Sequence, residues 1–215
     1  MGTPVKKRTA SKQERQLQLI QATIRSVSKN GLADTTMAAV AKEAGLSQGI
    51  INLHFQSKDR LLVETLRYIA DEYRTSWEKA LDGAGASPAE RLAALVEVDF
   101  KMPVCDRNKL AVWFAFWGES KSRPTYRKLC ASRDNEYRIK LESLCGELIE
   151  KGSYNGLNAM VLATGLSAMA EGLWLDLLIS PRSLTREQAR NICMAYLASA
   201  FPNHFSAPPP LQTSP

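Results

Sequence analysis

Residues 35–62 read TTMAAVAKEAGLSQGIINLHFQSKDRLL, and this stretch decides the fold. Thr36 stands where a helix should begin, apolar residues follow at helical spacing, and Gly45 suits the left-handed end of that helix. Ser47 then caps a second short helix, and Ser57 caps a third, much longer one. Two short helices joined by a tight glycine turn predict a helix-turn-helix, whose second helix enters the major groove of DNA.

The distribution of charge also favours binding to a polyanion. The whole chain of 215 residues carries 28 Lys and Arg against 22 Asp and Glu, a net charge of +6. Residues 1–60 hold 10 basic and 4 acidic side chains, whereas the other 155 residues hold 18 of each. All of the excess positive charge therefore lies on the segment with the helix-turn-helix, as expected of a surface that binds nucleic acid.

Several other classes of protein are disfavoured. No apolar run reaches the roughly 18 residues of a membrane span, and the first 16 residues lack the apolar core of a secretory signal. The four cysteines are scattered without a CxxC pair, which indicates reduced thiols in a cytoplasmic protein that needs no metal and no cofactor. The only histidines are His54 and His204, and no catalytic or phosphate-loop pattern is present, so we do not expect an enzyme.

Helical periodicity and capping signals recur along the chain, and nothing reads convincingly as a strand. The predicted fold class is all-α with nine helices: a three-helix head, a long linking helix and a helical body. The expected helices cover about 11–30, 36–44, 47–54, 57–81, 87–102, 106–121, 122–151, 157–179 and 185–202. The expected organisation is a disordered basic arm over residues 1–10, a DNA-binding domain over 11–56, a body over 57–204 and a disordered proline-rich tail over 205–215.

The opening stretch resembles the core of the tetracycline-repressor (TetR) family of regulators. In that family, a string of the form IA…AGVS.GTLY.YF.SKE.LL follows a helix-capping threonine. Asn52 departs from the pattern, because the family usually has Tyr there, and His54 stands where the family has Tyr or His. The matching residues are Ala41, Ala44, Gly45, Ser47, Gly49, Phe55, Ser57, Lys58, Leu61 and Leu62. The resemblance implies a nine-helix, homodimeric, ligand-responsive regulator whose residues 57–204 bind ligand and dimerise.

A narrower resemblance concerns the choline-sensing repressors of betaine synthesis, the BetI type. The run Gly49-Ile50-Ile51 before a small polar residue is similar to that group, as are AVWFAFW at 111–117 and EGLWL at 171–175. This resemblance implies a repressor of choline and glycine betaine metabolism genes that leaves its operator when a quaternary ammonium compound binds. The alternative is a regulator of the same family that senses an unrelated apolar or cationic compound, for example in the control of drug efflux.

Candidate DNA-binding residues lie on both short helices and at the start of the long one. Helix N-termini present unpaired N–H groups and a partial positive charge, so Thr36 is expected to lie at a phosphate. Lys58 fits the helix dipole poorly, which is explained if it faces phosphate, whereas His54 could either contact phosphate or be partly buried. Gln and Asn side chains can pair with adenine. The residues that the recognition helix should expose are Ser47, Gln48, Gly49, Asn52 and Leu53.

The body contains aromatic residues that could hold a cation. Trp113 and Trp117 are spaced i, i+4 on one expected helix, and Trp174 follows Glu171 by one turn on another. Such stripes are usually core packing, but aromatic faces beside a carboxylate also bind quaternary ammonium groups. The candidate pocket comprises Trp113, Phe116, Trp117 and Trp174, with Glu171 or Asp99 as the counter-charge.

The last two expected helices are predicted to form a dimer interface. The helix at 157–179 is apolar and contains small residues that allow close approach, and the helix at 185–202 is amphipathic. Two such helices from each subunit would form a four-helix interface, although both could instead be internal core. A homodimer would suit a palindromic operator of double-stranded DNA. The small residues are Ala159, Ala163, Ala168, Ala170 and Gly172.

Overall fold

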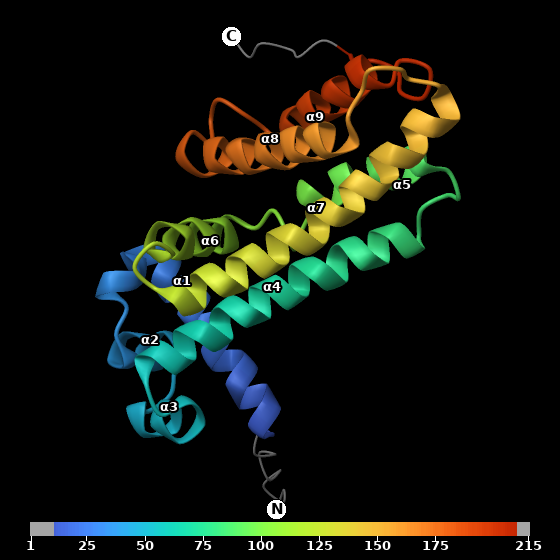
Figure 1. The fold of residues 1–215 in the computed structure, drawn as a ribbon. Helices are drawn as coiled ribbons and strands as arrows, with labels where there is room; N and C mark the ends of the chain where they lie inside the picture. Colours follow the sequence, from blue (N-terminus) through green and yellow to red (C-terminus); the bar gives the residue numbers. More distant parts are fainter. Residues whose placement is uncertain (1–10, 210–215) are drawn as a thin grey trace, which may run out of the picture.

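The computed structural model describes residues 11–209, except the side chain of Arg133. These residues form nine α-helices and no strand, so the predicted all-α fold class is confirmed (Figure 1). The predicted arm over residues 1–10 and residues 210–215 of the predicted tail lie outside the described residues. The helices are α1 Lys12–Asp34, α2 Met37–Ala44, α3 Gln48–Phe55, α4 Lys58–Asp82, α5 Pro88–Asp99, α6 Arg107–Glu119, α7 Pro124–Gly152, α8 Ala159–Ile179 and α9 Arg186–Ala200.

The helices of the head begin at the predicted capping residues. Thr36 accepts a hydrogen bond from the amide of Ala39 at 3.1 Å, and Ser57 accepts one from the amide of Arg60 at 3.2 Å. Ser47 precedes α3 as predicted, but its side chain makes no capping hydrogen bond. The hydroxyl of Ser47 therefore does not cap the N-terminus of α3.

Several helix boundaries differ from the prediction, and three of them have a clear local cause or consequence. Gly31, with a φ of 79°, interrupts α1 as expected of a stop signal, but one further turn continues the helix to Asp34. Pro124 occupies the first turn of α7, so Arg123 rather than residue 122 precedes that helix. The helix expected to reach residue 102 ends at Asp99, which places this carboxylate at the C-terminal end of α5.

The long helix α4 joins the two ends of the molecule. It begins beside α2 and α3, and then runs along α7 toward the end where α8 and α9 lie (Figure 1). Its buried side chains enter three successive cores, in the head, the middle and the body. They are Leu61 in the head core, Leu62, Leu66 and Ile69 in the middle core, and Tyr73, Trp77 and Leu81 in the body core. A displacement of α4 in the body therefore also reaches the head.

The helix α8 carries apolar residues on two faces. One face, which includes Leu166 and Trp174, is buried in the body core, whereas Val161 and Ile179 on another face are 61% and 65% exposed. By length and composition alone, α8 could cross a membrane, although the packing of its buried face makes it part of the helical body. The predicted tail also begins too early, because Phe205 is buried against the body core.

Candidate DNA-binding head and effector site

The helix α3 is held in the head by two buried side chains, with Ile50 and His54 partly buried, and presents its other residues outward. Ile51 and Phe55 are buried in the head core, together with Leu61 of α4. The expected recognition residues are all exposed, and Leu53 is 75% exposed. Those residues are Ser47, Gln48, Gly49, Asn52 and Leu53. The residues that the sequence analysis assigned to base and backbone contacts thus lie together on one exposed surface of the head.

Gly49 has space around it that the head itself does not use. A Cβ atom built on Gly49 would meet only the Oγ of Ser47, at 3.8 Å, and the residue is exposed. Folding of the head therefore does not require glycine at this position. The absence of a side chain leaves room for another molecule to approach the backbone.

Lys58 has an internal partner that explains its position at the start of α4. Its Nζ donates a hydrogen bond to the backbone carbonyl of Ala33, in the last turn of α1, at 3.0 Å. A cation at the C-terminal end of a helix interacts favourably with the helix dipole. This hydrogen bond accounts for the position of Lys58 within the head, and the phosphate contact stays a prediction. The ammonium group still has further N–H donors, so contact with a phosphate is compatible with this hydrogen bond.

Thr36 and His54 occupy different environments in the head. Thr36 is exposed at the N-terminus of α2, where its hydroxyl caps the helix. His54 is half-buried, and its Nδ1 is buried without a hydrogen-bond partner among the described residues. The two interpretations of His54, packing and phosphate contact, both suit this half-buried position.

In the body, the carboxylate of Asp99 is buried among aromatic side chains. Asp99 is 3% exposed; it accepts a hydrogen bond from the hydroxyl of Tyr73 at 2.8 Å and another from Tyr137 at 2.7 Å. The indole Nε1 of Trp174 donates to the backbone carbonyl of Asp99 at 2.8 Å. Side chains of α4, α7 and α8 thus converge on one residue of α5, two of them on its carboxylate and one on its backbone carbonyl.

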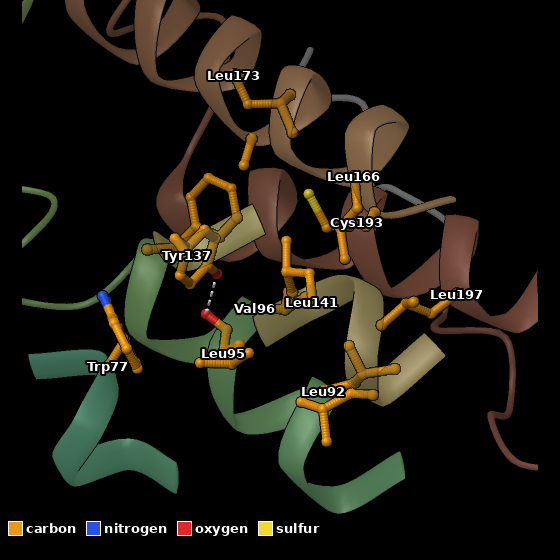
Figure 2. Packing of buried hydrophobic residues seen from close by; sticks show 14 of the residues in the cluster. Trp77, Leu92, Leu95, Val96, Tyr137, Leu141, Leu166, Leu173, Cys193 and Leu197 are labelled. Atoms are coloured by element: carbon orange, nitrogen blue, oxygen red, sulfur yellow. Dashed lines mark hydrogen bonds between the residues drawn. The ribbon is translucent and has the colours of Figure 1, made fainter. Parts of the chain in front are cut away.

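The rings around Asp99 also contact one another. The ring centroid of Tyr73 lies 5.3 Å from that of Tyr137 and 5.8 Å from that of Trp174, and Trp77 lies 6.2 Å from Tyr137. Figure 2 shows Trp77 and Tyr137 in this core, with the Tyr137 hydroxyl 3.3 Å from the carbonyl oxygen of Leu95. We call the group formed by Asp99, Tyr73, Trp77, Tyr137 and Trp174 the Asp99 cage.

Burial in this core keeps the neighbouring groups in their neutral forms. Burial raises the pKa of the Tyr137 hydroxyl well above its usual value, and the negative charge of Asp99 adds to the effect. Burial also raises the pKa of Cys193 to about 12, again with a contribution from Asp99. These groups remain protonated at neutral pH, so neither of them adds a negative charge to the cage.

The structure does not assemble the pocket that the sequence suggested. Trp113, Phe116 and Trp117 belong to the middle core, where the rings of Trp113 and Trp117 lie 6.2 Å apart and Phe116 packs on Tyr126 at 4.7 Å. Trp174, by contrast, lies in the body core beside Asp99. The i, i+4 spacing correctly paired Trp113 with Trp117, but it could not show which core they would enter.

Of the two candidate counter-charges, Asp99 is the one that the tyrosines of the body core bind. Glu171 is half-exposed and lines a hollow of about 420 Å³ between α7 and α8. Tyr73, Trp77 and Tyr137 were not among the predicted site residues. Tyr73 and Trp77 share the i, i+4 spacing that drew attention to the other tryptophans, so this signal was available, whereas nothing local marks Tyr137.

The all-helical fold, the exposed recognition helix and a separate body with a buried polar site define a helix-turn-helix regulator of transcription rather than an enzyme. Comparison with protein families agrees: residues 19–65 match the bacterial regulatory proteins of the tetR family, and residues 88–202 match the BetI-type transcriptional repressor, C-terminal. The chain belongs to the TetR family of transcriptional repressors and has a BetI-type C-terminal domain.

Individual relatives support the same assignment. The HTH-type transcriptional regulators BetI of Stenotrophomonas maltophilia (strain R551-3) and Burkholderia mallei (strain NCTC 10229) are each 33% identical, over 85% of this chain and 91% of their own length. A transcriptional regulator from Pseudomonas aeruginosa PAO1 has a TM-score of 0.77 at 29% identity, over 91% of this chain and 96% of its own. A regulator from Saccharomonospora viridis, solved in complex with choline, has a TM-score of 0.76 at 26% identity, over 84% and 94%.

Proposed function

We propose that this repressor responds to a small quaternary ammonium compound, with choline as the leading candidate, and that the Asp99 cage binds it. The observation that carries the proposal is a buried carboxylate surrounded by aromatic rings. A quaternary ammonium has no N–H to donate, so its recognition depends on Coulomb attraction and on cation–π contact with ring faces. The choline complex of the S. viridis relative lends support, as does the BetI-type match.

The position of Tyr73 suggests how the effector would act on the head. Tyr73 lies on α4, so a cation at Asp99 would contact the helix that begins next to the helix-turn-helix. With 25 residues, α4 is about 37 Å long at 1.5 Å per residue, so a small tilt at the cage gives a larger displacement at Lys58. The effector can shift this equilibrium only through a higher affinity for the conformation that does not fit the operator.

A partly buried ion pair would help to transmit the tilt to a neighbouring helix. The Nζ of Lys109 on α6 contacts the Oε2 of Glu72, the residue before Tyr73, and also donates to the carbonyl of Pro103 at 3.2 Å. Glu72 in turn accepts from Tyr68, whose hydroxyl is bound by Gln21 of α1 at 3.1 Å. This chain of polar contacts connects the cage region of α4 to the loop before α6 and to α1.

We further propose that the repressor is a homodimer through α8 and α9. Val161, Leu175 and Ile179 are exposed apolar residues on α8. Ala168 and Gly172, also exposed, lie between them on the same face, at intervals of three, four or seven residues. Ala163 and Ala170 are instead buried within the subunit, and Ala159 is half-buried, so they would not take part. A second copy of this chain would cover the exposed stripe, as is typical of apolar patches on soluble proteins.

Introducing a glutamate into the exposed apolar stripe of α8 tests the proposed dimer interface. Val161→Glu should convert the dimer to a monomer in sedimentation or light-scattering measurements, because a charge would be buried at the interface. Leu53→Glu is the matched control, since it adds the same charge at an exposed leucine of the head. A monomeric wild-type protein, or a dimer that persists in Val161→Glu, would contradict this interface.

The proposed unit of DNA binding is the segment 11–56, with residues 57–204 for the effector and the dimer. The dimer would present two recognition helices to successive major grooves, about 34–36 Å apart, and would therefore bind a palindromic operator of double-stranded DNA. Gln48 and Asn52 would read bases, and Thr36, Ser47, His54 and Lys58 would contact phosphate, with Leu53 and Gly49 at the groove surface. The protein would act in the cytoplasm on genes of choline and glycine betaine metabolism.

The effector is tested by titration of purified protein with choline, followed by calorimetry and tryptophan fluorescence. Asp99→Asn should weaken choline binding by about thirtyfold or more, since loss of one partner of a desolvated charge pair costs roughly 2–5 kcal/mol. Glu171→Gln is the matched control, because it makes the same change at the carboxylate that lies outside the cage. Circular dichroism and operator binding of both variants establish that they fold.

Two outcomes would redirect the assignment. No response of the wild type to millimolar choline, with operator binding intact, would exclude choline. A second hollow of about 440 Å³, lined by Met102, Leu110, Leu177, Arg107 and Arg186 among others, would then favour a bulkier apolar effector as in drug-responsive regulators. Loss of choline binding in Glu171→Gln but not in Asp99→Asn would move the site to the groove between α7 and α8.

A further inference from the structure

We propose that a surface groove between α4 and α7 is the route by which the cationic effector reaches the Asp99 cage. This inference rests on the proposed function and adds a second, outer binding site to it. The groove has a volume of about 260 Å³, close to the lower end of the roughly 300–1,000 Å³ typical of small-molecule sites. Its size suits a compact cation better than a bulky drug.

Trp77 connects the groove to the cage. Its side chain lines the groove but is only 7% exposed, so most of the indole faces the interior. On that inner side, Trp77 packs on Tyr137, the residue whose hydroxyl donates to Asp99 at 2.7 Å. Figure 2 shows Trp77 on α4 in the same core as Tyr137. A rotation of the Trp77 side chain would therefore open the groove toward the cage.

The groove carries two carboxylates with which a cation could pair, beside the two guanidinium groups of Arg67 and Arg74. Asp71 of α4 and Glu136 of α7 supply two carboxylates, and the indole of Trp77 supplies an aromatic surface. At present a guanidinium occupies these carboxylates: Arg74 lies 2.8 Å from Asp71 and 3.7 Å from Glu136. Arg74 thereby links α4 to α7 across the groove.

The link is weak enough for an incoming cation to replace it. The side chains of Arg74 and Glu136 are nearly half exposed, and ion pairs in such positions contribute little to stability. A quaternary ammonium that pairs with Glu136 would release Arg74 and allow α4 to separate from α7. Passage of the effector through the groove would thus begin the displacement of α4 that is proposed to release the repressor from its operator.

The first test blocks the groove without changing the cage. Ser132 is exposed and lines the groove on α7, so Ser132→Trp should fill it. In stopped-flow tryptophan fluorescence with choline, we expect association and dissociation both to slow on the order of tenfold, with the equilibrium affinity unchanged. Unchanged rates in a folded Ser132→Trp protein would overturn the route.

The second test distinguishes the Arg74 bridge between α4 and α7 from the general effect of removing a positive charge from the groove. Arg74→Ala and Arg67→Ala each remove one positive charge from the groove, but Arg67 pairs with Glu64 on its own helix, at 2.9 Å. Only Arg74→Ala removes the bridge to α7, so it should speed choline association by about two- to fivefold relative to Arg67→Ala. Equal rates for the two variants would overturn the role of Arg74.

The two levels of the proposal fail in different ways. If the wild-type protein does not bind choline, or if Asp99→Asn binds it as well as the wild type, the proposed effector site is wrong and the route with it. If choline binds and depends on Asp99 but Ser132→Trp leaves the rates unchanged, the cage stands and only the groove is rejected.

Discussion

Removal of the Tyr137 hydroxyl should destabilise the protein, because this hydroxyl is a donor to a buried carboxylate. The hydroxyl lies 2.7 Å from Oδ2 of Asp99, and both residues are 3% exposed. Tyr137→Phe keeps the ring and leaves almost no cavity, so the change isolates the hydrogen bond. It also leaves one carboxylate oxygen with one donor fewer in a site that water does not reach.

The magnitude follows from the burial and the charge of the acceptor. Hydrogen bonds to charged groups contribute roughly 1.5–3 kcal/mol, and a buried acceptor that loses its donor keeps its desolvation cost. We therefore expect the free energy of unfolding to fall by about 2–3 kcal/mol in Tyr137→Phe. For a protein of this size, each 1 kcal/mol lowers Tm by roughly 2–4 °C, so Tm should fall by roughly 4–12 °C.

Tyr126 on the same helix offers a matched control. Its ring is also 3% exposed, but its buried hydroxyl has no hydrogen-bond partner among the described residues. Tyr126→Phe should therefore leave stability unchanged or raise it by up to about 1 kcal/mol. Urea unfolding of the three proteins at one protein concentration measures both effects, since dimerisation makes stability depend on concentration. Equal stability changes in the two variants would refute the reasoning.

Three further predictions concern pH, thiols and DNA. The pKa of the Tyr137 hydroxyl is raised in the folded protein, so above about pH 10 the folded protein keeps a proton that the unfolded chain has lost. The free energy of unfolding should therefore be at its full value below about pH 10 and should fall above it. This fall should be less steep in Tyr137→Phe. The pKa of about 12 and the burial of Cys193 predict no reaction with a thiol reagent at pH 8 until the protein is unfolded. In mobility-shift assays, Lys58→Ala should weaken binding to every DNA sequence and Gln48→Ala should relax the choice of base; unchanged affinity in both would contradict the docking of α3.

The features that the sequence predicted well are those that depend on neighbours within one helical turn. The helices expected to begin near residues 87 and 185 do begin there, because Ser87 with Glu90 and Thr185 with Gln188 form capping boxes at a three-residue spacing. The helix-turn-helix also depends on a local signal, since Gly45 takes the left-handed conformation that ends α2. Such signals involve a few consecutive residues, so no knowledge of distant packing is needed to interpret them.

Predictions about partners far apart in the sequence were less successful. The hydrogen bond from Lys58 to the carbonyl of Ala33 was not predicted, because the two residues lie 25 positions apart and belong to different helices. Phe205 was assigned to a disordered tail because its proline-rich surroundings are typical of one, yet it packs on Phe201 and the body core. In both cases, the missing information was which surface the residue would contact after the helices had packed.

Helical period and capping are local properties, so the sequence was sufficient to predict the helices of residues 11–209, where they begin, and the helix-turn-helix of residues 35–62. Only the tertiary structure decided which aromatic residues meet which carboxylate. Periodicity fixes the face of a helix on which a side chain lies, but not the helix that this face contacts. The convergence of α4, α5, α7 and α8 places Asp99 with Tyr73, Tyr137 and Trp174, and leaves Trp113 and Trp117 in a different core.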